Sequence, residues 1–162
     1  MLNIKIICIG KIKEKSLKAL LDEYLKRISK YSKIEIISLD DEKLPSSLSQ
    51  AEINRIKKIE SLKIKEKISK YDKSTIIFLD LNGKQYTSEE FSNKLSYIST
   101  YESSTIIFVI GGSLGLSDEL LSLPSYKICF SKMTFPHQLI RVFLLEQIFR
   151  AFKIQNNEKY HH

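Results

Sequence analysis

Five short apolar runs, separated by longer amphipathic segments, constrain the fold of this chain more than any other feature. The runs cover residues 2–9, 34–39, 74–80, 104–110 and 126–130. In the first run, apolar side chains alternate onto both faces, with Ile6 on one and Ile7 on the other. Strands that are apolar on both faces are typical of a parallel sheet covered by helices. The runs therefore predict a buried, mostly parallel sheet.

Amphipathic helices are predicted between these runs. Residues 15–31 carry apolar side chains at i, i+3, i+4 and i+7, which form one stripe. Residues 50–71 carry a thinner stripe, and lysines fill the rest of that helix. Thr87 and Glu90 have the spacing of a capping box at the start of a third helix. For the last helix, residues 137–154, the pattern predicts these inward side chains: Leu139, Ile140, Phe143, Leu144, Ile148, Ala151 and Phe152.

The alternation of strands and helices predicts an α/β fold. We expect one domain over residues 1–162, with a five- to six-stranded, mostly parallel sheet and helices on both faces. The dipeptide Asn82-Gly83 is a turn signal, so the third strand is expected to end near residue 80.

Composition narrows the class of protein. The net charge is +7, from 26 Lys and Arg against 19 Asp and Glu, which suits a polyanionic partner. A chain rich in Ile, Lys, Ser and Asn also collects lysines on solvated faces without any such partner, so both interpretations stay open. No apolar run approaches the roughly 20 residues of a membrane span, and the N-terminus lacks a signal-peptide pattern. A cytoplasmic protein without a membrane partner is expected.

Neither the cysteines nor the histidines predict a metal site. Cys8 and Cys129 each lie inside an apolar run, where buried and unreactive thiols are expected. His137, His161 and His162 have no metal-site spacing with either cysteine. We therefore expect no bound metal.

Three strand ends are unusual, and ligands of open α/β sheets bind beyond such ends. The first follows Leu79, the second is Gly111-Gly112-Ser113-Leu114-Gly115, and the third is the segment 130–135. Glycines there would let a ligand approach the backbone, although a tight turn needs the same residues. Phe130, Met133 and Phe135 would suit the walls of an adenine pocket, or alternatively a hydrophobic plug under the last helix.

No nucleophile–base pair is visible, which is compatible with methyl transfer and counts against a hydrolase. Transfer from a sulfonium needs position and electrostatics more than acid–base groups. His137 and Arg141, four residues apart, share one helix face. That face would hold phosphate or a nucleobase, or would simply present a cation to solvent.

The final third of the chain resembles a known family. The matching residues are Gly111-Gly112-x-x-Gly115, the run from Ser131 through Arg141 (Ser-Lys-Met-Thr-Phe-Pro-His-x-Leu-x-Arg), Glu146-Gln147-x-x-Arg150-Ala151, and Tyr160-His161. Together they resemble the RlmH family, the pseudouridine-N3 methyltransferases of large-subunit ribosomal RNA within the SPOUT superfamily.

The resemblance implies a deep trefoil knot in the C-terminal third, a homodimer, and S-adenosylmethionine bound in the knot. The substrate would be a pseudouridine in 23S ribosomal RNA, on the assembled 70S ribosome. Tyr160 and His161 would reach the target nucleotide, with His137, Arg141 and His162 near the RNA. By motif position, the cofactor contacts are Leu79, Gly111, Gly112, Phe130, Ser131, Lys132, Met133, Thr134 and Phe135.

Two features depart from the family pattern. His162 stands where the family carries Arg or Lys, so a neutral imidazole would weaken a phosphate contact there. The lysine-rich helix from Arg55 to Lys73 is interpreted as compositional drift. We also expect a side chain at Gly112 to block the cofactor while leaving the fold intact. The alternatives are another SPOUT methyltransferase, acting on transfer RNA or another ribosomal RNA site, and a non-catalytic ribosome-binding domain.

Overall fold

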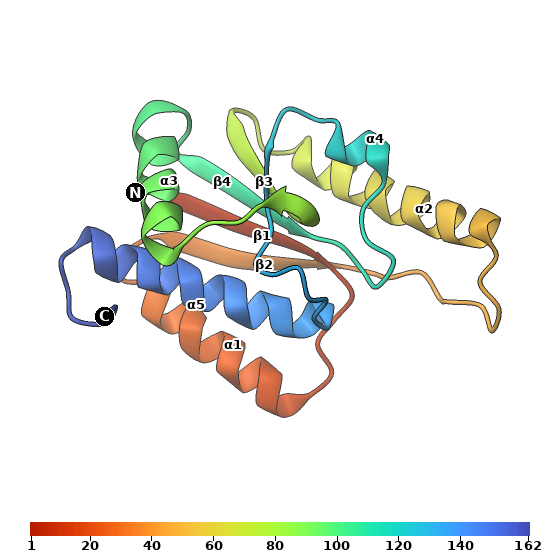
Figure 1. The fold of residues 1–162 in the computed structure, drawn as a ribbon, viewed down its shortest axis with the longest axis horizontal. Coiled ribbons are helices and arrows are strands. Elements are labelled where there is room, and N and C mark those ends of the chain that lie inside the picture. Colours follow the sequence, from red (N-terminus) through yellow and green to blue (C-terminus); the bar gives the residue numbers. More distant parts are fainter.

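The computed structural model describes residues 1–162, and at its centre lies one five-stranded sheet in which every pairing is parallel (Figure 1). The strands follow the order β2-β1-β4-β3-β5. Their bounds are β1 Asn3–Ile9, β2 Lys33–Leu39, β3 Ser74–Lys84, β4 Thr105–Ile110 and β5 Tyr126–Ile128. The parallel α/β fold is confirmed, while the trefoil knot stays a prediction.

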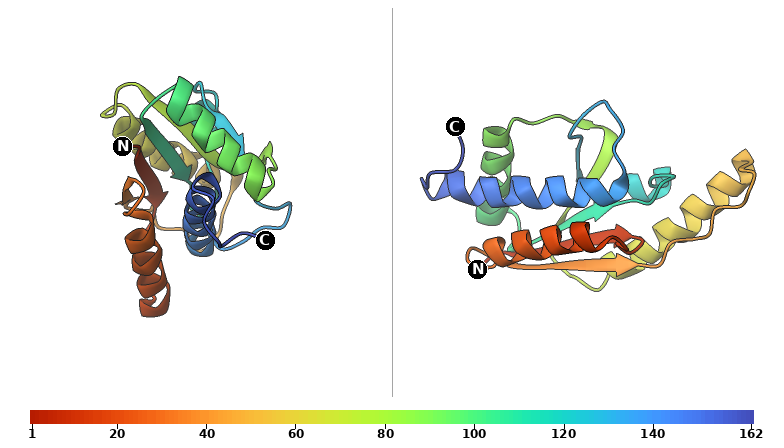
Figure 2. Two further views of the ribbon diagram at one scale, coloured as in Figure 1. Left: turned by 90° about the vertical axis from the view of Figure 1, so that its left-hand side faces the viewer. Right: turned by 90° about the horizontal axis from the view of Figure 1, so that it is seen from below.

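Five helices cover the two faces of the sheet (Figure 2). They are α1 Lys15–Ile28, α2 Gln50–Ile68, α3 Ser88–Tyr101, α4 Asp118–Leu121 and α5 His137–Gln155. On one face, α1, α3 and α5 pack over Ile6 and its neighbours in a core of 20 residues. On the other, α2 and α4 pack over Ile7 in a core of nine. The two apolar faces of β1 predicted this sandwich.

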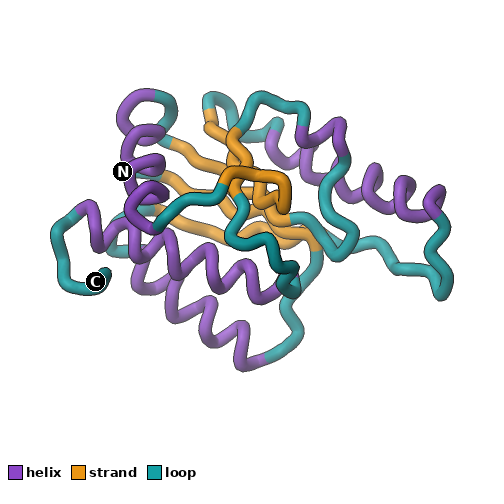
Figure 3. Tube along the Cα trace, in the orientation of Figure 1, coloured by secondary structure: helices purple, strands orange, loops and turns teal.

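β3 differs from its sequence prediction. The Asn82-Gly83 signal was expected to end the strand, but the chain makes an excursion there and returns to the sheet, visible as a hook in Figure 3. Leu79 and Lys84 both pair with Ile128 of β5, with a register shift between them. A Cβ at Gly83 would lie 2.7 Å from the carbonyl carbon of Ile128. Gly83 is therefore required by close backbone packing rather than by a chain-reversing turn.

The predicted capping box is present at α3. The Thr87 hydroxyl accepts from the Glu90 amide at 3.1 Å, and the Glu90 carboxylate accepts from the Thr87 amide at 2.8 Å. These contacts satisfy two of the free N–H groups at the helix start. They also fix the start of α3 beside the middle of α5, where the Ser88 hydroxyl donates to Gln147.

The inward face of α5 is only partly as predicted. Leu144, Ile148, Ala151 and Phe152 are buried, but Phe143 is 40% exposed, and Leu139 and Ile140 are half-buried. α5 lies between α1 and α3, so the face turned toward them also buries Arg141, Val142, Leu145 and Phe149. The single-stripe prediction failed because this helix is covered on more than one side. Pro136 is its cap rather than its first residue.

Both cysteines are buried, as expected of unreactive thiols, and burial raises the pKa of the Cys8 thiol to about 11. No group of three or more His, Cys, Asp or Glu side chains could hold a metal ion. None of the helices is both long enough and apolar enough to span a membrane.

Candidate functional site

A cleft of about 630 Å³ lies at the carboxyl ends of β3, β4 and β5. It brings together the three strand ends that the sequence singled out. Eight of the nine predicted cofactor residues line it: Leu79, Gly111, Gly112, Phe130, Ser131, Met133, Thr134 and Phe135. Lys132 is exposed and does not line the cleft, because successive residues of an extended loop point in different directions.

The glycine segment after β4 is both a tight turn and a cleft wall. The Gly115 amide donates to the Gly112 carbonyl at 3.0 Å, and Gly115 has a φ of +83°, which disfavours side chains. A Cβ at Gly112 would lie 3.0 Å from Glu60 Oε1 and 3.1 Å from the side chain of Ile9. A side chain at Gly112 would therefore require Glu60 or Ile9 to shift by a few tenths of an ångström. The expectation that such a side chain blocks the cofactor while leaving the fold intact stays a prediction.

The segment 130–135 forms the opposite wall. Phe130 packs against the larger core, as a hydrophobic plug would, but Met133 is 74% exposed. The Phe135 ring meets Phe143 edge-on, with ring centroids 5.5 Å apart. The Ser131 hydroxyl accepts from the Met133 amide at 3.0 Å and holds the loop bend. The loop thus combines one half-buried aromatic anchor, Phe130, with apolar side chains available to a ligand.

His137 and Arg141 have different surroundings despite sharing a helix face. His137 lines the cleft, and its pKa is lowered, mainly by burial and then by the Arg141 charge, so the ring is neutral at pH 7. Arg141 is 1% exposed, and its Nη2 donates to the carbonyls of Ile9 at 2.8 Å and Gly10 at 2.9 Å. The expected RNA contact by Arg141 does not match this position. Its guanidinium instead holds the end of β1 against α5.

Two polar side chains of α2 support the glycine wall, and sequence reasoning missed both. The buried Glu60 carboxylate accepts from the Glu42 amide at 3.0 Å, and burial is the main cause of its raised pKa. The buried Ser61 hydroxyl accepts from the Ser117 amide at 3.0 Å. Glu60 lies at i+4 from Ile56 and at i−4 from Ile64, inside the apolar stripe. A carboxylate in that stripe was the signal that could have identified it.

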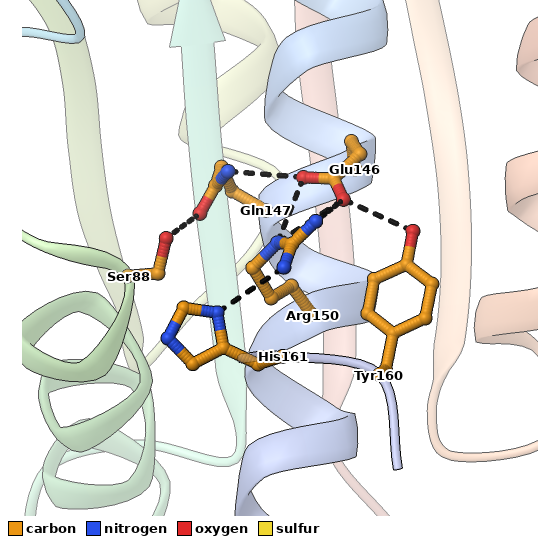
Figure 4. A network of polar contacts seen from close by, with 6 residues as sticks. All are labelled: Ser88, Glu146, Gln147, Arg150, Tyr160 and His161. Atoms are coloured by element: carbon orange, nitrogen blue, oxygen red, sulfur yellow. Dashed lines mark hydrogen bonds and ion pairs between the residues drawn. The ribbon is translucent and has the colours of Figure 1, made fainter.

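The predicted catalytic residues Tyr160 and His161 lie in a polar network with side chains of α5 (Figure 4). Neither of them lines the cleft. Glu146 accepts from Arg150 at 2.6 Å, from Tyr160 at 3.0 Å and from Gln147 at 2.9 Å. Burial and the Glu146 contact raise the pKa of Tyr160 to about 12. His162 is exposed.

His161 bridges two charged groups in this network. Its Nδ1 lies 3.1 Å from Arg150 Nη1, and its Nε2 lies 2.6 Å from Glu89 Oε1. A guanidinium only donates, so Nδ1 accepts and Nε2 donates to Glu89. The side chain is thus held in a single tautomer between α5 and the start of α3.

A second cleft of about 330 Å³ separates the two regions. The cofactor loop forms one side of it, through Phe130 and Phe135, and Glu146 and Gln147 of α5 form another. Nine residues of α5, about 14 Å of helix, separate His137 from Glu146. Tyr160 and His161 line neither cleft. Within one chain, therefore, the predicted catalytic tail and the predicted cofactor residues do not meet.

Comparisons with known proteins give the same assignment along the whole chain. A family described as "Predicted SPOUT methyltransferase" matches residues 2–161. A protein of Clostridium botulinum (strain Okra / Type B1) named "Ribosomal RNA large subunit methyltransferase H" is 56% identical over 160 residues, 99% of both chains. A Clostridium perfringens (strain SM101 / Type A) protein named "Ribosomal RNA large subunit methyltransferase H 1" is 52% identical over the same coverage.

The fold also resembles a solved structure. A probable methylase family protein from Haemophilus influenzae Rd KW20 aligns with a TM-score of 0.55 at 17% identity, covering 99% of this chain and 71% of that one. This likeness concerns the fold alone. With the full-length family match and the two clostridial relatives, it leads to one conclusion: the chain belongs to the SPOUT methyltransferase family.

Proposed function

We propose that this protein transfers a methyl group from S-adenosylmethionine to N3 of a pseudouridine in 23S ribosomal RNA, on the assembled 70S ribosome in the cytoplasm. Family membership and the names of the clostridial relatives support an RNA methyltransferase of the large subunit. The main observation in favour of S-adenosylmethionine as the cofactor is the cleft at the ends of β3, β4 and β5.

The residues of this cleft fit S-adenosylmethionine. Its volume lies within the roughly 300–1,000 Å³ common for small-molecule sites. Phe130 and Phe135 offer apolar walls for an adenine, and the glycine segment lets a ligand approach the backbone. Asp80 and Asp118 also line the cleft and would attract the positive groups of the cofactor. Lys132 has no part in this proposal, because it lies outside the cleft.

In the proposed reaction, the main role of the chain is to position the two reactants. When bound, S-adenosylmethionine supplies an electrophilic methyl group. In this proposal N3 of the pseudouridine would take up that methyl group and lose its proton to solvent, and S-adenosylhomocysteine would be the second product. The chain holds the two reactants in line, which lowers the barrier by reducing the entropy lost on reaction. Neutral His137 adds no positive charge beside the sulfonium.

The tail requires a second chain in this proposal. We place Tyr160 and His161 at the target nucleotide and His162 toward the RNA. Since the tail does not line its own cleft, pairing of two chains through the knotted region would bring the tail of one toward the cleft of the other. The outward side of α5, with half-buried Ile140 and 40%-exposed Phe143, is the proposed contact surface.

Calorimetry and methyl incorporation test the proposal. S-adenosylmethionine should bind the purified protein, and 70S ribosomes should accept methyl groups while free 23S RNA and isolated 50S subunits do not. Met133→Ser should weaken cofactor binding without lowering stability, because Met133 is exposed and lines the cleft. Its neighbour Lys132 gives the matched control, Lys132→Ser. Absence of cofactor binding would end this assignment.

Mapping modified nucleotides in a deletion strain separates the alternatives. Loss of one methyl group on a single pseudouridine of 23S RNA supports the proposed reaction. Loss of a methyl group from transfer RNA or another ribosomal site would favour a different SPOUT methyltransferase. Unchanged RNA, together with cofactor-independent ribosome binding, would indicate a non-catalytic domain.

A further inference from the structure

Lys57 is the only lysine or arginine among the 24 residues that line the larger cleft. It lies on α2, three and four residues before Glu60 and Ser61, and so shares their helix face. The sequence interpretation treated the lysines of this helix as compositional drift. The position of Lys57 separates it from the others.

The helix that carries Lys57 is fixed at the cleft. Glu60 and Ser61 are each 4% exposed and bind the backbone amides of Glu42 and Ser117, which belong to two different loops. Glu60 also lies against Gly112. These contacts hold α2 at the edge of the cleft, where the Lys57 side chain is part of the lining.

Lys57 has no partner of opposite charge in the chain. The ion pairs of α2 use Arg55, Lys63 and Lys65, which contact Glu52, Glu42 and Glu119 respectively. Lys57 is half-buried, whereas its neighbour Lys58 is exposed. An ammonium group that lines a cleft without a counter-charge in the chain can form a charge-assisted hydrogen bond with an anionic ligand.

We propose that Lys57 forms an anion subsite of the cleft and binds a negatively charged oxygen group of the ligand. The inference rests on the proposed function, in which two reactants carry such groups: the carboxylate of S-adenosylmethionine and the phosphates of RNA. The cleft lining carries charges complementary to those of the cofactor: the carboxylates of Asp80 and Asp118 would suit its two positive groups, and Lys57 would suit its one negative group.

Lys57→Gln tests the subsite, with Lys58→Gln as the matched control and Lys57→Arg as the charge-retaining variant. Calorimetry would compare S-adenosylhomocysteine with 5′-methylthioadenosine, which keeps the adenosine and sulfur but lacks the carboxylate. If the cofactor supplies the anion, Lys57→Gln lowers S-adenosylhomocysteine affinity by roughly tenfold or more and leaves methylthioadenosine unchanged. Lys57→Arg should restore most of the affinity.

A second arm measures 70S ribosome binding over a range of salt concentrations. If a phosphate supplies the anion, Lys57→Gln lowers the slope of log affinity against log salt by about one, with S-adenosylhomocysteine affinity unchanged. Either result supports the anion subsite and identifies the ligand that supplies the anion. No effect in both arms, or an equal effect of Lys58→Gln, overturns it. Failure of the unsubstituted protein to bind S-adenosylhomocysteine would instead remove the proposed function, and this inference with it.

Discussion

The larger cleft and the tail network lie along the same helix, α5, but they are built in opposite ways. The cleft consists mainly of glycine backbone and apolar side chains, and its one lysine has no partner. In the tail network, by contrast, Glu146, Arg150, Tyr160 and His161 all satisfy one another. A ligand entering the cleft therefore breaks no ion pair of Lys57, Asp80 or Asp118, whereas the tail must exchange its existing contacts before it can touch RNA.

This difference separates the two binding steps energetically. The cofactor would bind to a preorganised surface and add contacts to it. Engagement of Tyr160 by a nucleotide must first offset its hydrogen bond to the Glu146 carboxylate, worth about 1.5–3 kcal/mol because the acceptor is charged. Engagement of His161 must first break its contact with Glu89.

The largest effect is expected in the framework of the cleft. Gly83→Val should destabilise the protein by about 3 kcal/mol and separate β3 from β5, because its Cβ would lie 2.7 Å from backbone atoms of Ile128. Urea denaturation measures this change. Gly115→Ala is the control: its Cβ meets open space, so only its positive φ costs energy, about 1–2 kcal/mol. Equal losses in both variants would show that packing against β5 does not set the requirement.

Removal of the central carboxylate of the tail should have a smaller effect and leave the cleft unchanged. Glu146→Ala should cost about 1–2 kcal/mol, because Arg150 and Tyr160 lose a shared acceptor. The pKa of Tyr160 should fall from about 12 in a spectrophotometric titration but stay above its ordinary value, because burial, the larger cause, remains. Tyr126, also near 12 through Glu102, serves as an internal reference. Glu66→Ala is the control for the general effect of replacing a helical glutamate by alanine. A matching loss of cofactor affinity would contradict the separation of the two regions.

The cleft should respond to mild acid through His137. Burial, with a smaller contribution from Arg141, lowers its folded pKa below 6.5. The stability it contributes is therefore complete above pH 6.5 and is lost as pH falls through the folded pKa. Protonated His137 should also repel a sulfonium, so S-adenosylmethionine should lose more affinity than uncharged-sulfur S-adenosylhomocysteine. His137→Gln should abolish that difference, and a persistent difference in this variant would assign the effect elsewhere.

The smallest effect is expected at the exposed contact between His161 and Glu89. The hydrogen bond to His161 lowers the pKa of Glu89, so the contact contributes fully above pH 4.5 and is lost as pH falls through the lowered pKa. NMR signals of the His161 ring should report the loss of this contact as pH falls below 4.5. Glu89→Gln should weaken the acid dependence of these signals. An unchanged acid dependence in Glu89→Gln would show that Glu89 does not hold the ring.

The sequence was most informative where local patterns decide the structure. The two-faced apolar pattern of β1 predicted a covered parallel sheet, and the Thr87–Glu90 spacing predicted the cap of α3. The cleft walls followed from their place after strands, because parallel strands bring their carboxyl ends to one edge. The inward face of α5 was less predictable. A helix packed between two others buries residues that a single stripe does not contain, including Arg141.

The amino-acid sequence by itself determined the α/β architecture, the three loops that meet at one sheet edge, and the family resemblance, because strand patterning and short motifs are local properties. Only the tertiary structure decided which side chains face the cleft. It placed Lys57 in the lining of the cleft and Lys132 outside the cleft. It also directed the Cβ position of Gly112 toward Glu60. It also paired Tyr160 with Glu146 and His161 with Glu89. Such contacts join residues far apart in the chain, and their geometry depends on how helices and sheet pack together.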